Sequence, residues 1–202
     1  MSILSQSICS ILLASSFLFN GAYGRELLGY RIVPQEEADF VNEHNKPYTE
    51  EKDYERFYDQ MGKGLHLVNE PASWWGREWE WYCAFEADLE KIKEATKVWI
   101  PHVNYMYYEN LWYREEREIL EYITTIVSEN PEKALRFSIG YFSARTEEMT
   151  MAIPLAAVQN NDYDLWGKCW RTRDELKEYA NRILDWRSWE IIGTPGEREK
   201  TL

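Results

Sequence analysis

Two segments that lie far apart in the sequence carry the residues best suited to chemistry. Arg31 lies within the short apolar run 28–33, and Glu148 stands at the start of the apolar run 149–153. A guanidinium group forms paired hydrogen bonds with phosphate oxygens, and a carboxylate stabilises positive charge that develops in a transition state. If both side chains face one pocket, they could bind a phosphorylated substrate and assist the loss of a leaving group from it.

The elements that must position these residues are short strands. Apolar or alternating runs bounded by Gly, Pro and Asn predict strands at residues 28–33, 65–68, 79–87, 98–100 and 149–153. Bulky side chains at Trp79, Trp81, Cys83 and Phe85 alternate with their neighbours, so one face of that strand should be buried. Cys169 lies in a further aromatic-rich segment that is typical of a strand.

Three helices are predicted between and after these strands. Pro34 suits the first position of a helix that ends near Asn45, and apolar residues within 112–127 recur at the spacing of one helix face. Thr172 and Glu175 form the capping-box pattern of a third helix. Its apolar face would contain Leu176, Tyr179, Ala180 and Ile183. There is no βαβ regularity and no internal repeat, so the sequence predicts a single α+β domain.

Residues 1–24 have the features of a signal peptide. They contain no charged residue, carry an apolar stretch from Ile8 to Phe19, and end in the small-x-small pattern of Ala22 and Gly24. The absence of a positively charged start leaves an uncleaved anchor as the alternative. We expect a secreted, extracellular protein, with later delivery into host cells as a second possibility. The domain would span residues 25–192, followed by a flexible tail at 193–202.

Charge and composition limit the kinds of partner. The net charge of −12 argues against a protein that binds nucleic acid through its phosphates. The three histidines lie in different segments, so no metal site is predicted. No stretch after residue 24 is long and apolar enough to span a membrane, and we expect a soluble monomer after cleavage.

Cys83 and Cys169 are the two cysteines that remain after the predicted cleavage. An oxidising secretory route would allow them to form a disulfide. The alternative is a pair of buried thiols that act as small hydrophobic side chains.

In order along the chain, five segments resemble the toxin-type ADP-ribosyltransferases, the family of the heat-labile enterotoxin and cholera toxin A chains and of secreted fungal relatives. These segments are Tyr30-Arg31, residues 64–69, residues 81–88, Glu147-Glu148 before residues 149–154, and residues 164–170. The resemblance implies a split mixed or antiparallel sheet with flanking helices around a cleft. It also implies that NAD is the substrate and a host protein the acceptor.

The resemblance assigns a role to each matching residue. Arg31 would bind the dinucleotide, Gly64, His66 and Asn69 would shape the nicotinamide pocket, and Glu148 would contact the nicotinamide ribose, with Glu147 beside it. Two departures from the family pattern matter. The Ser-Thr-Ser triplet of the second strand is replaced by residues 67–69, and the position two residues before Glu148 holds Thr146 instead of Glu. Transfer to arginine is therefore in doubt.

Three functions remain open on this basis. The first is a secreted toxin or effector that transfers ADP-ribose from NAD to a host protein. The second is an effector of the same fold that has lost the reaction and binds a host protein through an aromatic-rich, acidic surface. The third is a carbohydrate-binding module, suggested only by the ten Trp and fourteen Tyr residues. The individual residues also have simpler roles, because Arg31 could be an ion-pair partner and His66 could face solvent.

Overall fold

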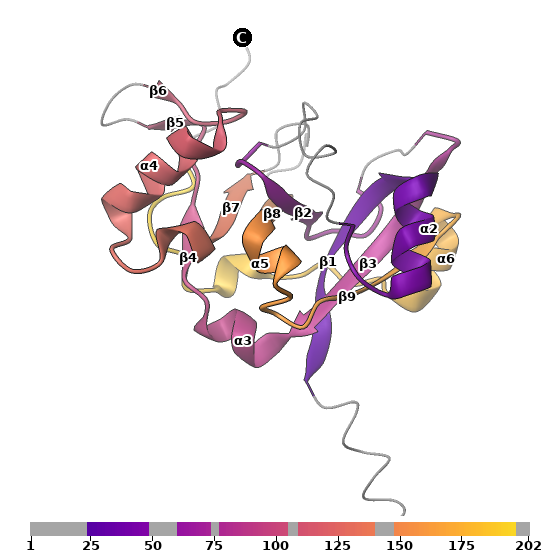
Figure 1. The fold of residues 1–202 in the computed structure, drawn as a ribbon. Coiled ribbons are helices and arrows are strands. Elements are labelled where there is room, and N and C mark those ends of the chain that lie inside the picture. The colour runs from indigo at the N-terminus through magenta and orange to yellow at the C-terminus, as the bar shows by residue number, and fades with distance from the viewer. Residues whose placement is uncertain (1–23, 49–59, 74–76, 105–108, 140–147, 197–202) are drawn as a thin grey trace, which may run out of the picture.

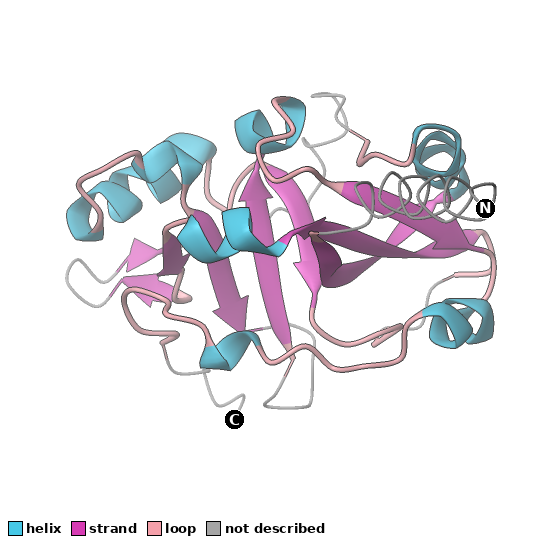
Figure 2. Ribbon diagram, turned by 90° about the horizontal axis from the view of Figure 1, so that it is seen from below, coloured by secondary structure: helices cyan, strands magenta, loops and turns pink. Residues whose placement is uncertain are grey.

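The computed structural model describes residues 24–48, 60–73, 77–104, 109–139 and 148–196. They form one α+β domain in which helices lie on both faces of a central sheet (Figure 2). The sheet has seven strands in the order β4-β7-β8-β2-β1-β3-β9. These strands are β1 Arg25–Pro34, β2 Gly64–Val68, β3 Glu80–Asp88, β4 Lys97–Trp99, β7 Leu135–Ile139, β8 Met149–Pro154 and β9 Trp166–Trp170.

The remaining elements lie around this sheet. Helices α2 Gln35–His44 and α6 Arg173–Tyr179 lie near one end of it, and α4 Glu116–Ile126 lies near the other (Figure 1). Short helices α3 Leu89–Glu94 and α5 Leu155–Gln159 follow β3 and β8 directly. A two-stranded sheet of β5 Val103–Asn104 and β6 Glu109–Asn110 lies beside α4, and 3-10 turns occupy Pro131–Lys133 and Trp186–Ser188.

Two groups of strands make up the large sheet, and they meet at one place. All neighbouring strands are antiparallel except β4 and β7, which are parallel. Between β1 and β2, the described residues pair only at Tyr30 and Val68, whereas β1 and β3 pair from Arg25 to Pro34. The group β4-β7-β8-β2 and the group β1-β3-β9 are therefore joined by a narrow junction.

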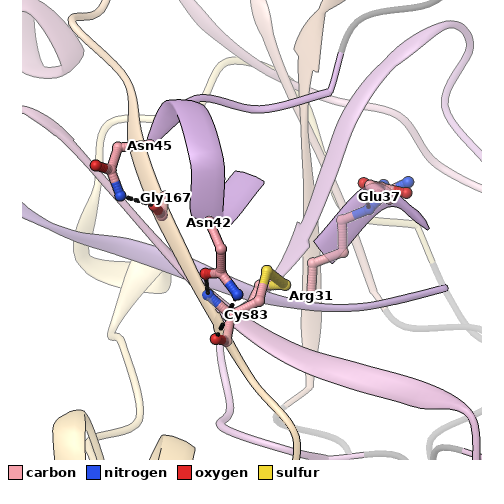
Figure 3. Close-up of a disulfide and its surroundings, with 7 residues drawn as sticks. Arg31, Glu37, Asn42, Asn45, Cys83 and Gly167 are labelled. Atoms are coloured by element: carbon pink, nitrogen blue, oxygen red, sulfur yellow. Dashed lines mark hydrogen bonds and ion pairs between the residues drawn. A yellow bond between two sulfur atoms is a disulfide. The ribbon is translucent and has the colours of Figure 1, made fainter. Parts of the chain in front are cut away.

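Both outer edges of the sheet are covered. At β9, the side chain of Asn42 in α2 pairs with the backbone of Cys169, and Asn45 pairs with Gly167 (Figure 3). At β4, the backbone of Ile192 accepts a hydrogen bond from Trp99 and donates one to Lys97. Exposed strand edges promote association with other strands, so this covering keeps the sheet from extending.

The segment 180–192 connects several parts of the fold. The hydroxyl of Tyr30 donates to the carbonyl of Arg182 at 2.9 Å, and the backbone of Leu184 donates to the carbonyl of Asn69, also at 2.9 Å. The segment then passes through Trp186 in the core and reaches β4 at Ile192. It therefore links the junction between the two strand groups to the β4 edge.

The largest core cluster lies on one face of the sheet and spans both strand groups. It includes Phe85, Phe137 and Trp186, and the rings of Phe137 and Trp186 meet edge to face at 5.8 Å. Close packing in this core explains Gly29 in β1, because a Cβ atom there would lie 2.8 Å from the Cβ of Leu67. A disulfide joins Cys83 and Cys169, which are direct cross-strand partners of β3 and β9.

Most predicted strands and helices are present with shifted ends. The predicted helix 112–127 begins only at Glu116, where Glu115 and Glu118 form a capping box. The third helix has the expected Thr172 and Glu175 cap but ends at Tyr179, which leaves Ile183 outside it and 60% exposed. Strand β7 and helix α5 were not predicted. No described helix is long and apolar enough to cross a membrane, and the predicted signal peptide lies almost entirely outside the described residues.

Candidate functional site

The three segments predicted to form the site occupy neighbouring strands. β2 lies between β1, which carries Arg31, and β8, which begins directly after Glu148. The register places Tyr30, Val68 and Thr150 in one row across these strands. The fold thus brings residues 30–31, 64–69 and 148–154 into one region. Glu147 lies outside the described residues.

Strand alternation places Arg31 on the face of the sheet opposite to Tyr30. Side chains in one cross-strand row share a face, so Tyr30, Val68 and Thr150 point the same way. Arg31 follows Tyr30 by one residue and belongs to the other face, together with its partner Cys83. Glu148 lies before β8, which begins at Met149, so this alternation does not assign it a face.

Arg31 is bound within the fold. Its Nε lies 3.2 Å from Oε1 of Glu37 in α2, and its Nη1 donates to the backbone carbonyl of His66 at 3.3 Å. Figure 3 shows the Arg31 and Glu37 side chains meeting. Both are largely buried, with exposed fractions of 27% and 14%. Arg31 ties α2 and β1 to β2 across the narrow junction.

His66 makes a contact with the turn that precedes its own strand. Its Nε2 lies 2.8 Å from the carbonyl oxygen of Gly62, so this nitrogen carries the proton and donates. Burial lowers the pKa of His66 to about 4, and the charges of Arg31 and Arg136 act in the same direction. The imidazole is therefore neutral at pH 7.

Asn69 is a buried link between three chain segments. Its Oδ1 accepts from the backbone of Met149 at 2.9 Å, and its Nδ2 donates to the carbonyl of Leu184 at 3.3 Å. Its own carbonyl accepts from the backbone of Leu184. The amide thus connects the end of β2 to the start of β8 and to the segment 180–192.

Gly64 is required by a close backbone approach. A Cβ atom at this position would lie 2.1 Å from the carbonyl oxygen of Ile153 in β8. Real atoms do not approach so closely, so β2 could not pair with β8 in this way if residue 64 had a side chain. The glycine has a structural reason that is independent of any ligand.

An ion pair that the sequence analysis did not single out lies on the face of His66, with its arginine buried and its carboxylate 36% exposed. Arg136 in β7 is fully buried, and both its terminal nitrogens donate to the carboxylate of Glu116 in α4, at 2.8 and 2.5 Å. Arg136 also donates to the carbonyl of Met61, and the backbone of Lys63 donates to Glu116. The signal in the sequence was a single Arg within the apolar run 134–139.

This ion pair fixes the turn at residues 60–63, which leads into β2. Arg136 and His66 both face Ala152 from the neighbouring strands, so the charged group and the imidazole flank a small side chain. The carbonyl oxygens of Met61 and Gly62 accept hydrogen bonds from these two residues. The cluster of Gln60, His66, Glu116, Arg136 and Ser138 therefore holds the turn.

The cluster continues toward Thr150 through polar contacts. Gln60 donates to the hydroxyl of Ser138 at 3.1 Å, and Ser138 lies opposite Thr150. Glu148 is 3% exposed. Among the described residues, no group of His, Cys, Asp and Glu could hold a metal ion.

Comparison with known proteins identifies a family. Residues 59–194 match the model of a family described as a family of unknown function, DUF5910. The chain belongs to this family. No curated protein and no solved structure matches it. The part shared with DUF5910 contains both cysteines and the pair of Arg136 and Glu116, and it begins after Arg31.

Proposed function

We propose that this protein acts by binding another protein, and that it does not transfer ADP-ribose from NAD. The supporting observation is that the residues expected to bind NAD are bonded to other residues of the same chain. Arg31 is bound to Glu37, His66 to Gly62, and Asn69 to Met149 and Leu184. Each would have to give up an internal partner to contact a dinucleotide.

The placement of the charged groups supports the same proposal. Binding NAD and stabilising the charge that develops on its ribose would need an accessible cation and an accessible carboxylate. Arg31 is paired with Glu37, and Glu148 is 3% exposed. Neither charged group is open to a dinucleotide without a local rearrangement.

Exposed aromatic side chains offer a surface for a protein partner. Trp79, just before β3, is 57% exposed, and Arg77 lies 5.5 Å from its ring centre. Tyr179 of α6 is 45% exposed, and its ring lies tilted against that of Trp170 of β9, with 4.6 Å between the ring centres. Aromatic residues and Arg are the side chains most enriched at the centres of protein interfaces. These residues are our candidates for the contact with a host protein.

We infer secretion from residues 1–24, and the disulfide between Cys83 and Cys169 is compatible with it. The partner would then be met outside the producing cell, or in a host cell after delivery. The protein would function as an effector or toxin without an enzymatic step.

Calorimetric titration of residues 25–202 with NAD tests the proposal, together with an assay of nicotinamide release over several hours. We expect neither binding nor release. The partner surface is tested separately by capture from host extracts, in which Trp79→Ser and Tyr179→Ser are compared with the parent and with Tyr122→Phe, a variant outside this surface. NAD binding or turnover by the parent would overturn the proposal.

A second candidate is slow ADP-ribose transfer, and one observation favours it. β2, with residues 64–68, lies between β1, which carries Arg31, and β8, which begins directly after Glu148. If this function is correct, the parent releases nicotinamide, and Arg31→Lys and Glu148→Gln lose that activity while remaining folded.

A further inference from the structure

One residue at the narrow junction between the two strand groups can take up a proton. Next to the Tyr30–Val68 pair, the backbone carbonyl of His66 accepts a hydrogen bond from Arg31 of the other strand group. The side chain of His66 donates to Gly62 in the turn before β2. One residue therefore helps to hold both the junction and the turn.

Two cations disfavour a proton on the imidazole of His66. They are Arg31, which binds the backbone carbonyl of His66 from β1, and Arg136 in β7. The carboxylates of Glu37 and Glu116 are each bound to one of these guanidinium groups. Within the described residues, β8 contributes Ala152 opposite His66, and α5, which also packs on β2, carries no charged residue.

We propose that His66 is an acid-operated latch, whose protonation loosens the turn at residues 60–63 and the junction between the two strand groups. An imidazolium could still donate to Gly62, but it would stand in a largely buried place near two other cations. The native state can relieve this repulsion by letting water reach His66. The inference is independent of the proposed protein-binding function.

Several contacts would transmit the loosening. The carbonyl of Gln60 accepts from the backbone of Tyr113, and the carbonyl of Lys63 accepts from the backbone of Leu155. The backbone of Lys63 donates to Glu116 at the start of α4. Release of the turn would expose the amide groups of Lys63, Tyr113 and Leu155.

The pH range follows from the direction of the shift. In an open or unfolded state His66 binds a proton below about pH 6.5, whereas in the closed state its pKa is about 4. Between these values the open state holds one more proton, so the closed state loses stability as the pH falls. At full effect the opening equilibrium increases by about 30-fold from pH 7.5 to pH 5.

Amide hydrogen exchange on residues 25–202 at pH 7.5 and pH 5, corrected for intrinsic rates, tests the latch. We expect protection of Lys63, Tyr113 and Leu155 to fall by about 30-fold. Protection of Gly167 and Cys169, whose amides are held by Asn45 and Asn42, should stay nearly constant. An equal loss at all five amides, or no loss at any, would overturn the proposal.

Replacement of the imidazole provides the matched control. His66→Gln places an amide nitrogen near the position of Nε2 and has no titrating group, so the local loss of protection should disappear. The imidazole resonance that disappears in His66→Gln belongs to His66. In the parent, this resonance should keep the chemical shift of a neutral imidazole at pH 5. If His66→Gln retains the local loss, or if that resonance titrates near pH 6.5, the proposal is wrong. The resonance can be assigned through His66→Asn if the first variant does not fold.

Discussion

The side-chain amide of Asn42 pairs with the backbone of Cys169 in the way that a neighbouring strand would. Its Nδ2 donates to the carbonyl of Cys169 at 3.1 Å, and its Oδ1 accepts from the N–H of the same residue at 2.8 Å. Asn42→Ala should reduce the free energy of unfolding by about 2 kcal/mol, because two hydrogen bonds are lost. Urea denaturation measures the change.

Loss of this pairing should also make β9 available to other chains. We expect Asn42→Ala to form dimers or larger species at high concentration, detected by size-exclusion chromatography with light scattering. Asn42→Asp is the control, since it keeps the acceptor and the shape but lacks the donor, and it should have an intermediate effect. Asn42→Ala that remains as stable and as monomeric as the parent would show that the helix does not protect this edge.

Arg31 and Glu37 should be energetically coupled. We expect Arg31→Ala and Glu37→Ala each to lower the free energy of unfolding by about 1–2 kcal/mol, and the double variant to lose about 1 kcal/mol less than their sum. The measurement is a double-mutant cycle by urea denaturation. If Arg31 served only a ligand, removing it would leave stability unchanged and the coupling would be absent.

The disulfide should stabilise the domain through the unfolded state. It joins residues 86 positions apart, and closing a loop of that length destabilises the unfolded chain by about 4.6 kcal/mol. Cys83→Ala with Cys169→Ala should lower the urea midpoint and raise the slope of the transition, because the unfolded chain is more expanded. An unchanged midpoint would mean that strand pairing alone holds β3 and β9 together.

Removal of Glu116 should lower the free energy of unfolding, because Arg136 then lacks its carboxylate partner. Glu116→Ala removes the carboxylate and leaves a fully buried guanidinium group, which should cost about 3 kcal/mol of stability. Replacing both residues, as Arg136→Met with Glu116→Leu, should recover most of this loss because no buried charge remains. Thermal and urea unfolding of the three proteins provide the comparison. A double variant less stable than Glu116→Ala would contradict this account of the pair.

Local patterns predicted much of the fold. The alternation of Trp81, Cys83 and Phe85 predicted β3, and the Thr172–Glu175 capping box located the start of α6. The expectation of a single buried face was wrong, because Trp79 lies before β3 and is 57% exposed, while Tyr82 and Ala84 on the other face are buried. The predicted end of α6 was wrong, because the apolar spacing continues to Ile183 but the helix ends at Tyr179. Beyond it, Arg182 accepts a hydrogen bond from Tyr30, and Leu184 donates one to Asn69. Such a departure is set by tertiary contacts that no local pattern contains.

The site was harder to predict than the fold. The resemblance grouped Arg31, the 64–69 segment and Glu148 in one site, and β1, β2 and β8 are neighbouring strands. It did not contain the register, and a change of one residue in register moves a side chain to the opposite face. Arg136 was overlooked because its partner, Glu116, is one of many acids in the chain and is selected only by the packing of α4 on the turn.

The position of segment 180–192 has a consequence for biosynthesis. A ribosome delivers these residues after all the described strands, yet they bind the junction at Asn69 and supply the backbone that covers β4. Until they emerge, a nascent chain presents an open strand edge at β4 and a junction that lacks the contacts of Asn69 with Leu184. The described domain is therefore expected to complete its sheet only after residues 180–192 have left the ribosome.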